Sequence, residues 1–123
     1  MSKEIKLLGF NFTKILVERF PEVKGSVTLK SDINIKNISK QENKIINQDM
    51  LQVDFNFSLI FENMGQILIE GSFILGVDEK EASEIQEQWK NKKLDEERKM
   101  FILNLIMQKC SLKALQLEEE FNN

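Results

Sequence analysis

Residues 51–61, LQVDFNFSLIF, alternate apolar and polar side chains without interruption until Ile60. Successive side chains of a β-strand point to opposite faces of the sheet, so this period of two predicts a strand whose odd-numbered residues face a core. Residues 65–76, GQILIEGSFILG, alternate in the same phase. The two segments together predict an antiparallel β-hairpin with one apolar face.

The register of this hairpin follows from the requirement that directly opposed residues share a face. If apolar residues lie opposite apolar residues, the two residue numbers of each pair must add to an even total. This favours a three-residue loop, 63–65, over a two-residue loop. We therefore expect Phe61 opposite Ile67, and Gly71 opposite Phe57, where the missing side chain leaves room for the ring or for a helix.

Two further strands precede the hairpin. Residues 7–19 carry apolar side chains in both alternate sets, as in a strand covered on both faces for part of its length. Residues 27–35 alternate again, Ile38 is off register as a β-bulge would produce, and the polar residues 39–49 predict a connection. With helices after the hairpin, this order predicts one α+β domain over 1–123: a four-stranded antiparallel sheet followed by two or three helices packed on one face.

After the hairpin the period becomes helical. Asp78, with Glu81 three residues on, predicts the N-cap of a first helix. Its apolar positions form a single narrow stripe of Ala82, Ile85 and Trp89. We expect this stripe to pack on the sheet.

A second helix is predicted from an N-cap at Asp95, and its residues 100–107, MFILNLIM, are apolar nearly all round. Ser111 predicts the start of a short third helix, held down by Leu112, Leu115 and Leu117. Burying one Leu, Ile or Phe side chain contributes about 1.5–3 kcal/mol, whereas a whole domain is stable by only about 5–15 kcal/mol. The second helix therefore needs cover on more than one side, and a second copy of the chain is the economical candidate.

The residue types that carry most catalytic chemistry are scarce. The chain has no histidine, and its single cysteine, Cys110, falls on an apolar helix and is expected to be a core residue. The glycines form no phosphate-binding pattern. Asp32, Asp54 and Glu70 lie on the polar sides of strands, with Asp54 and Glu70 four residues apart in the expected register. We therefore expect solvated carboxylates, no enzyme, no cofactor and no metal.

Charge and hydropathy narrow the partners further. Lys and Arg number 17 against 20 Asp and Glu, a formal net charge of -3, so a nucleic-acid partner is not expected. No apolar run approaches the roughly 20 residues of a membrane-spanning helix, and the N-terminus lacks the apolar core of a signal peptide. We expect no membrane insertion and a cytoplasmic location.

The order of four strands followed by helices, with a rich apolar sheet, resembles the SecB-like fold of export chaperones. FNFTKILVERF (10–20) resembles the first strand of that family, and MLQVDFNFSLIFE (50–62) with GQILIEGSFILG (65–76) resembles its long central hairpin. The chain is most similar to the small SecB-like proteins of bacteria and archaea, some of which are associated with toxin–antitoxin systems. It lacks the Cys-Pro segment and the zinc-binding tail of bacterial SecB, which argues against the translocase motor as a partner.

The resemblance implies a homo-oligomer whose apolar grooves hold unfolded or partly folded segments of other polypeptides. We therefore expect a non-enzymatic, chaperone-like binding protein. The alternative is a structural or adaptor protein whose apolar surface is used up by self-assembly or by one fixed protein partner. Polypeptide-binding or oligomer contacts are expected at six apolar positions: Leu8, Phe10, Phe12, Ile60, Leu68 and Ile74. In the expected register Ile60 lies opposite Leu68.

Overall fold

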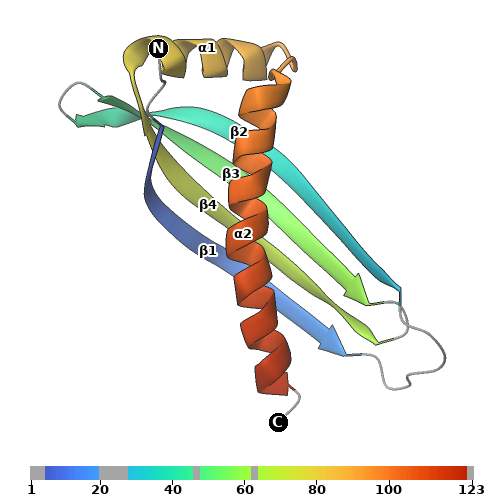
Figure 1. The fold of residues 1–123 in the computed structure, drawn as a ribbon. Helices are drawn as coiled ribbons and strands as arrows, with labels where there is room; N and C mark the ends of the chain where they lie inside the picture. Colours follow the sequence, from blue (N-terminus) through green and yellow to red (C-terminus); the bar gives the residue numbers. More distant parts are fainter. Residues whose placement is uncertain (1–4, 20–27, 46–47, 62–63, 122–123) are drawn as a thin grey trace.

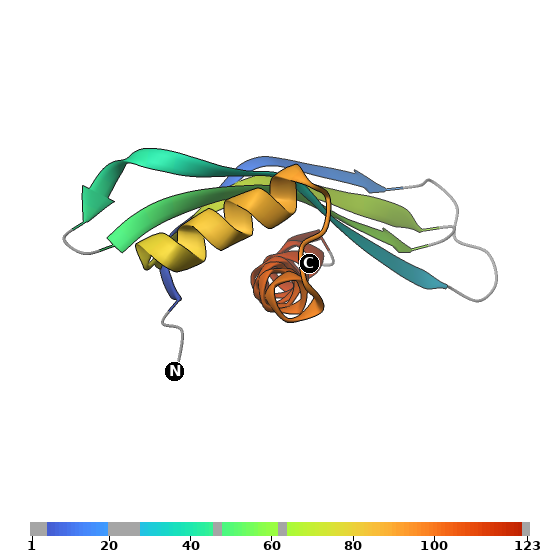
Figure 2. The same cartoon turned by 90° about the horizontal axis from the view of Figure 1, so that it is seen from above.

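In a computed structural model of the protein, four strands form one antiparallel sheet, and two helices pack on the same face of it (Figure 1, Figure 2). The structure describes residues 5–19, 28–45, 48–61 and 64–121. The elements are β1 (Lys6–Arg19), β2 (Leu29–Ile45), β3 (Gln48–Phe61), β4 (Gly65–Val77), α1 (Glu79–Lys90) and α2 (Glu96–Phe121). The expected α+β fold is confirmed.

The strand order in the sheet is β1-β4-β3-β2, and every neighbouring pair is antiparallel. Strands β2, β3 and β4 are therefore connected in sequence as neighbours, whereas β1 lies beside β4 at the opposite edge from β2. Among the described strands, β1 and β2 each pair with one neighbour only, which makes them the two edges of the sheet.

The β3–β4 register differs by two residues from the expected one. Phe61 lies opposite Gly65, and Gly71 lies opposite Phe55 where Phe57 was expected. The paired residue numbers do add to an even total, as expected, so the predicted apolar residues share one face of the sheet. Gly65 belongs to the strand and not to the loop, since it pairs with Phe61 on one side and with Arg19 on the other. A side chain is excluded there, because a Cβ would collide with the backbone carbonyl of Glu18 in β1. Loop residues 62–63 lie outside the described part of the chain.

Strand β2 is longer than the hydrophobic pattern predicts. The expected bulge is confirmed by a register shift between Ile35 and Asn37. The expected connection over 39–49 is wrong, because β2 continues to Ile45 and β3 already begins at Gln48. Ser39, Lys40 and Gln41 pair with β3 through the backbone. Two of their side chains also contact β3: Gln41 Nε2 donates to Gln52 Oε1 at 3.0 Å, and Lys40 Nζ lies 3.2 Å from Asp49 Oδ2.

The core lies between the sheet and the helices. We call the covered side of the sheet the helix face and the other side the open face. Odd-numbered residues of β3 and β4 supply the buried layer, and α1 and α2 each contribute one stripe to it. The buried apolar residues are Ile38, Leu51, Val53, Phe55, Phe57, Ile67, Ile69, Phe73, Leu75, Val77, Ala82, Ile85, Ile102, Ile106, Cys110 and Ala114.

Helix α1 begins as the sequence predicts, since Asp78 Oδ1 accepts a hydrogen bond from the Glu81 N–H at 2.7 Å. It ends without a glycine. The Lys92 N–H donates to Trp89 O at 3.0 Å and the Lys93 N–H donates to Gln88 O at 2.8 Å, which is the hydrogen-bond pattern of a Schellman motif. Lys92 has a φ of 58°, the left-handed conformation that this motif requires and that a lysine rarely adopts.

Helix α2 is continuous, so the expected third helix is wrong. Asp95 caps its start, because Asp95 Oδ1 accepts from the Arg98 N–H at 2.8 Å. Ser111 lies inside the helix, with its Oγ 3.4 Å from Met107 Sδ. The buried stripe passes straight through this region, since Cys110 and Ala114 continue the four-residue spacing of the residues before them. Neither helix in the described part of the chain is long and apolar enough to cross a membrane.

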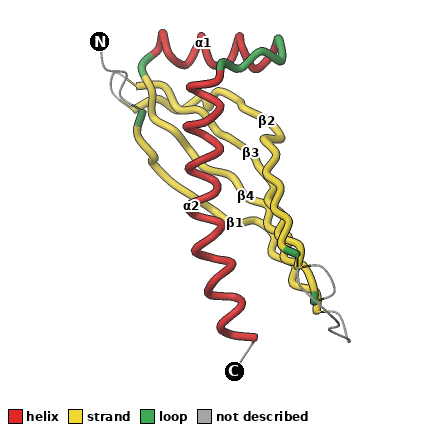
Figure 3. Tube along the Cα trace, turned by 45° about the vertical axis from the view of Figure 1, so that its right-hand side comes forward, coloured by secondary structure: helices red, strands yellow, loops and turns green. Residues whose placement is uncertain are grey.

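The C-terminal end of α2 diverges from the strands (Figure 3). Among the described side chains of the helix, its outward leucines are the most exposed apolar ones: Leu112 is 62% exposed and Leu115 is 56% exposed. These two residues therefore do not hold a helix against the sheet, contrary to expectation. The end of the sheet that carries the β3–β4 turn projects past the helices.

Candidate functional site

The two helices meet at a corner that is held by one buried cation. Arg98 is buried, its Nε donates to Glu81 Oε1 at 2.5 Å, and Glu81 on α1 is buried as well. The same guanidinium donates to Glu84 Oε2 at 2.5 Å and to Asp95 Oδ2 at 2.9 Å. The hydrogen bond to Glu81 raises the pKa of Arg98 above its usual value, although burial alone would lower it. Arg98 therefore stays charged and fixes the angle at which α2 leaves α1.

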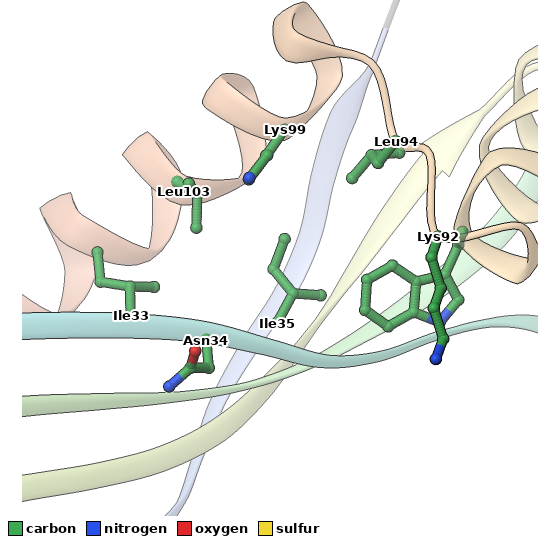
Figure 4. A pocket seen from close by; sticks show the side chains of 8 residues that line it. Ile33, Asn34, Ile35, Lys92, Leu94, Lys99 and Leu103 are labelled. Atoms are coloured by element: carbon green, nitrogen blue, oxygen red, sulfur yellow. The ribbon is translucent and has the colours of Figure 1, made fainter.

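Beside this corner lies a groove between the helices and the edge strand β2, with a volume of about 320 Å³ (Figure 4). We call it the β2 groove. Ile33 and Ile35 point from β2 toward α2, while Leu103 and Lys99 point from α2 toward β2. The lining residues are Ile33, Asn34, Ile35, Trp89, Lys92, Leu94, Lys99 and Leu103. Five of these eight lining residues are apolar.

The charged residues of the β2 groove are all positive. Lys92 and Lys99 are exposed, and no Asp or Glu belongs to the lining. Neither lysine ammonium forms an ion pair with a carboxylate among the described residues. The indole of Trp89 has a fixed orientation, because its Nε1–H donates to Asn37 Oδ1 at 3.3 Å. The groove can therefore accept apolar groups along its floor and a negative charge near its rim.

A second apolar surface lies on the projecting end of the sheet. The β2–β3 and β1–β4 registers place Ile15, Val17, Leu29, Leu59 and Phe61 on the helix face there, and we call these five residues the distal apolar surface. Leu29 is 57% exposed and Ile15 is 37% exposed, while the other three are half-buried. Helix α2 has diverged from the strands at this point (Figure 3).

Helix α2 also carries apolar residues on its outward side. Phe101 is 41% exposed, Leu105 is half-buried, and both Leu112 and Leu115 are largely exposed. These four residues, the outer stripe of α2, repeat at intervals of seven: Leu105 with Leu112, and Phe101 with Leu115 two intervals away. This is the spacing of a seam that packs against another helix.

The six predicted contact residues lie on different sides of the sheet. Phe10 and Phe12 lie half-buried on the helix face, where the Phe10 ring stacks on Phe73 with centroids 5.5 Å apart and planes inclined by 3°. Phe12 packs edge-on against Phe10 at 5.3 Å. Leu8 is the extra residue of a β1 bulge and is 41% exposed.

The other three predicted residues, Ile60, Leu68 and Ile74, lie half-buried on the open face. The two-residue shift in register separates Ile60 from Leu68: Ile60 lies opposite Gln66, and Leu68 lies opposite Ser58. The structure therefore does not gather the six residues into one site.

The open face holds a polar depression of about 360 Å³. Asp54 and Glu70 both line it, and the observed register places them two residues apart along the strands, since Asp54 lies opposite Ser72. The expected separation of four residues is therefore wrong. Each carboxylate has a protein partner: Glu70 Oε1 lies 3.3 Å from Lys36 Nζ, and Asp54 Oδ1 accepts from Gln52 Nε2 at 2.9 Å.

The β2 groove and the distal apolar surface were not predicted. Ile33, Ile35 and Leu103 are all visible in the sequence as apolar residues, but their periodicity indicates only that they face inward. One feature of the sequence could have indicated the groove. Leu94 is an apolar residue in the connection between the two helices, directly after Lys92 and Lys93.

Comparison of the chain with protein-family models, with curated proteins and with solved structures returned no match. The geometry and chemistry of the surfaces are therefore the basis on which a function is assigned.

Proposed function

We propose that the protein is a non-enzymatic, chaperone-like binding protein that holds unfolded or partly folded polypeptide on the apolar surface of a homo-oligomer. In this proposal it is a relative of the SecB-like chaperones, as the layout of its sequence suggests. The observation that supports it best is the distal apolar surface, five apolar residues on the helix face, of which Leu29 and Ile15 are exposed and the other three are half-buried.

Uncovered apolar surface suits a binding protein of broad specificity. Burial of apolar groups is non-directional, so one surface accepts many side-chain sequences, and monomeric soluble proteins rarely leave large contiguous apolar patches in contact with water. The outer stripe of α2 adds apolar residues on a second side of the molecule. One of these surfaces can serve self-assembly while the other remains available to clients.

An extended polypeptide is the form of client that fits the sheet. Strand β2 is an edge among the described strands, so its outward backbone N–H and C=O groups are available to pair with another strand. A segment added along β2 would place alternate side chains over the β2 groove, next to Ile33 and Ile35. Unfolded chains are extended and have unpaired backbone groups, whereas folded proteins do not.

Suppression of aggregation tests this proposal. An unrelated protein is diluted from denaturant in the presence of increasing amounts of this protein, and light scattering is followed. We expect scattering to fall to near zero at about one assembly per client. A polar variant, Ile15→Ser with Leu29→Ser, should bind less client because these exposed residues belong to the distal apolar surface. Unchanged scattering with the wild-type protein would contradict the proposal.

The alternative is a structural or adaptor protein, and the seven-residue spacing of the outer stripe of α2 favours it, because such a seam fits one regular helical partner. The two functions differ in whether apolar surface remains exposed after the protein has assembled. A dye that fluoresces on apolar surfaces should bind strongly to the assembled chaperone and weakly to an adaptor complex. The dye is added to protein whose mass in solution has been measured, so that the assembled state is known.

A further inference from the structure

We propose that the β2 groove selects polypeptide segments in which a carboxylate accompanies the apolar side chains, and that Lys92 and Lys99 are the residues that read this charge. The inference rests on the proposed function and adds to it the class of segment that is bound. It depends on three observations: the charges of the groove, the backbone at Lys92, and the free edge of β2.

The charge of the groove is opposite to that of the whole chain. The protein has a formal net charge of -3, yet the lining contains two lysines and no carboxylate. Acidic residues are close along the sequence, but Asp95 is engaged with Arg98 at the helix corner. Glu96 and Glu97 are also exposed nearby, but neither lines the groove, so a negative charge on a ligand inside it would be attracted to the two lysines.

The backbone at Lys92 holds one of these charges at the rim. Lys92 occupies the left-handed position that usually belongs to glycine, with a φ of 58°, and its side chain extends beside β2 (Figure 4). A non-glycine residue in this conformation is strained, and strain of this kind is concentrated at functional sites. Lys99 stands on the other wall, one turn before Leu103. The two lysines thus stand on different sides of the groove.

The free edge of β2 identifies the ligand as polypeptide. A fatty acid would also combine an apolar body with a carboxylate, but it has no use for backbone hydrogen-bonding groups. Residues 29–35 of β2 run without a bulge next to the groove, and β2 pairs only with β3 among the described strands. An added strand can therefore pair with β2 and direct every second side chain toward Leu94 and Leu103.

Labelled peptides of about ten residues test the inference directly. In each, Ser alternates with Leu or Phe, and one of the Leu or Phe positions is replaced by Glu, Gln or Lys. Fluorescence anisotropy gives the dissociation constant of each peptide. We expect the Glu peptide to bind about five- to ten-fold more tightly than the Lys peptide at low salt, with the Gln peptide between them. The preference should shrink at about 0.5 M salt because screening weakens exposed charge pairs.

A charge-matched pair of variants locates the effect. Lys92→Asn with Lys99→Gln removes both groove charges, and asparagine tolerates the left-handed conformation at position 92. Lys80→Gln with Lys109→Gln removes the same charge from exposed lysines outside the groove. The groove variant should bind the Glu and Lys peptides equally, and the control variant should keep the wild-type preference.

The outcomes separate this inference from the proposed function. Equal binding of the three peptides by a wild-type protein that suppresses aggregation overturns the charge selection and leaves the function intact. A preference that survives in the groove variant overturns the assignment to Lys92 and Lys99. Binding of octanoate in place of peptide overturns polypeptide as the ligand. Failure to bind any peptide, together with no suppression of aggregation, overturns both proposals.

Discussion

Phe55 occupies the space that a side chain at residue 71 would need. A Cβ built on Gly71 would lie 2.5 Å from Asn11 O in β1 and 2.8 Å from the Phe55 ring. Phe55 is fully buried, and its ring centroid lies 5.3 Å from that of Phe10 and 5.9 Å from that of Phe73. The ring cannot move without disturbing this cluster. Gly71 is thus required by packing and not by the backbone conformation of a turn.

Gly71→Ala should therefore lower the free energy of unfolding by about 1–3 kcal/mol, because overpacking displaces the ring or separates the strands. Urea denaturation followed by circular dichroism measures the change. Gly9→Ala is the matched control in strand β1, since a Cβ at that position would meet nothing within 4 Å. The same loss of stability in both variants would show that the effect comes from strand glycines in general.

The buried thiol of Cys110 makes stability depend on pH. Burial raises its pKa to about 12. An unfolded thiol ionises near pH 8.5, so above about pH 9 the unfolded chain releases a proton that the folded chain retains. Stability is then fully present below pH 8.5 and falls by about 1.4 kcal/mol per pH unit up to pH 12.

The Cys110→Ala variant lacks the thiol but keeps every lysine. Comparison with the wild-type protein therefore separates the effect of thiol ionisation on stability from that of lysine titration. We expect the difference in unfolding free energy between the wild-type protein and the variant to narrow by about 2 kcal/mol between pH 8 and pH 10.5. Denaturant titrations at the two pH values give this difference. If the wild-type protein and the variant lose stability in parallel, the thiol ionises equally in both states.

At the scale of the elements, the corner between α1 and α2 depends on Arg98. Arg98→Met should cost about 3–5 kcal/mol, because it leaves the carboxylate of Glu81 buried without its main partner. Arg98→Met with Glu81→Met should recover most of this loss, since a buried ion pair can be replaced by apolar residues of similar volume. Thermal and urea unfolding of the single and double variants measure both values.

An exposed ion pair provides the comparison for this prediction. Lys36 and Glu70 are joined at 3.3 Å on the open face, with side chains that are 49% and 38% exposed. Lys36→Met should change the free energy of unfolding by at most about 1 kcal/mol. A larger loss of unfolding free energy at Lys36 than at Arg98 would contradict the prediction that the buried cation contributes more to stability than the exposed one.

The end of α1 stores a small amount of strain. Replacement of Lys92 by glycine, Lys92→Gly, should stabilise the protein by about 1 kcal/mol, because glycine adopts the left-handed conformation without steric cost. The increase is read from the denaturation midpoint. Lys90→Gly, two residues earlier at the last helical position of α1, should instead destabilise by about 1 kcal/mol. Equal effects of the two changes would show that Lys92 is not strained.

Elements were predictable where local chemistry decides them. Asp78 and Asp95 were recognisable as N-cap residues, and the alternation in β3 predicted correctly which of its residues are buried. The end of β2 and the continuity of α2 were not predictable in this way. Ser39, Lys40 and Gln41 stay in a strand because β3 supplies backbone partners. Ser111 stays in a helix because Cys110 and Ala114, on either side of it, are buried in the core. Tertiary contacts decided both cases.

At the scale of the whole molecule, assembly should depend on the outer stripe of α2. Leu112→Glu with Leu115→Glu places charges at two positions that are 62% and 56% exposed in the single chain, so the fold should survive. The mass in solution should fall from that of an oligomer to that of one chain, because two charges would have to be buried in the interface. Light scattering coupled to gel filtration measures it.

The control for assembly changes charge on the same helix without touching the stripe. Lys109→Glu with Gln116→Glu alters two exposed positions, and it should leave the mass unchanged. A wild-type protein that is already a single chain would contradict the proposed homo-oligomer. Dissociation of both variants would point to net charge as the cause and not to the seam.

The candidate site was less predictable than the fold, for a geometric reason. Period and spacing assign a residue to a face of its own strand or helix, but the β2 groove is formed by a strand, two helices and the connection between them. Ile33 and Lys99 are 66 positions apart in the printed sequence and become neighbours only through the corner at Arg98. The angle of that corner depends on a buried ion pair that no local pattern contains.

The strand order has a consequence for synthesis of the chain. Strand β1 is made first, yet its only described partner is β4, which ends at Val77, after β2 and β3 have been made. At about 5–20 residues per second, β1 leaves the ribosome several seconds before that partner exists. During this delay its aromatic and aliphatic side chains have no native contact. The meander of β2, β3 and β4 can close through neighbouring segments, so the first strand to be translated is the last to join the sheet.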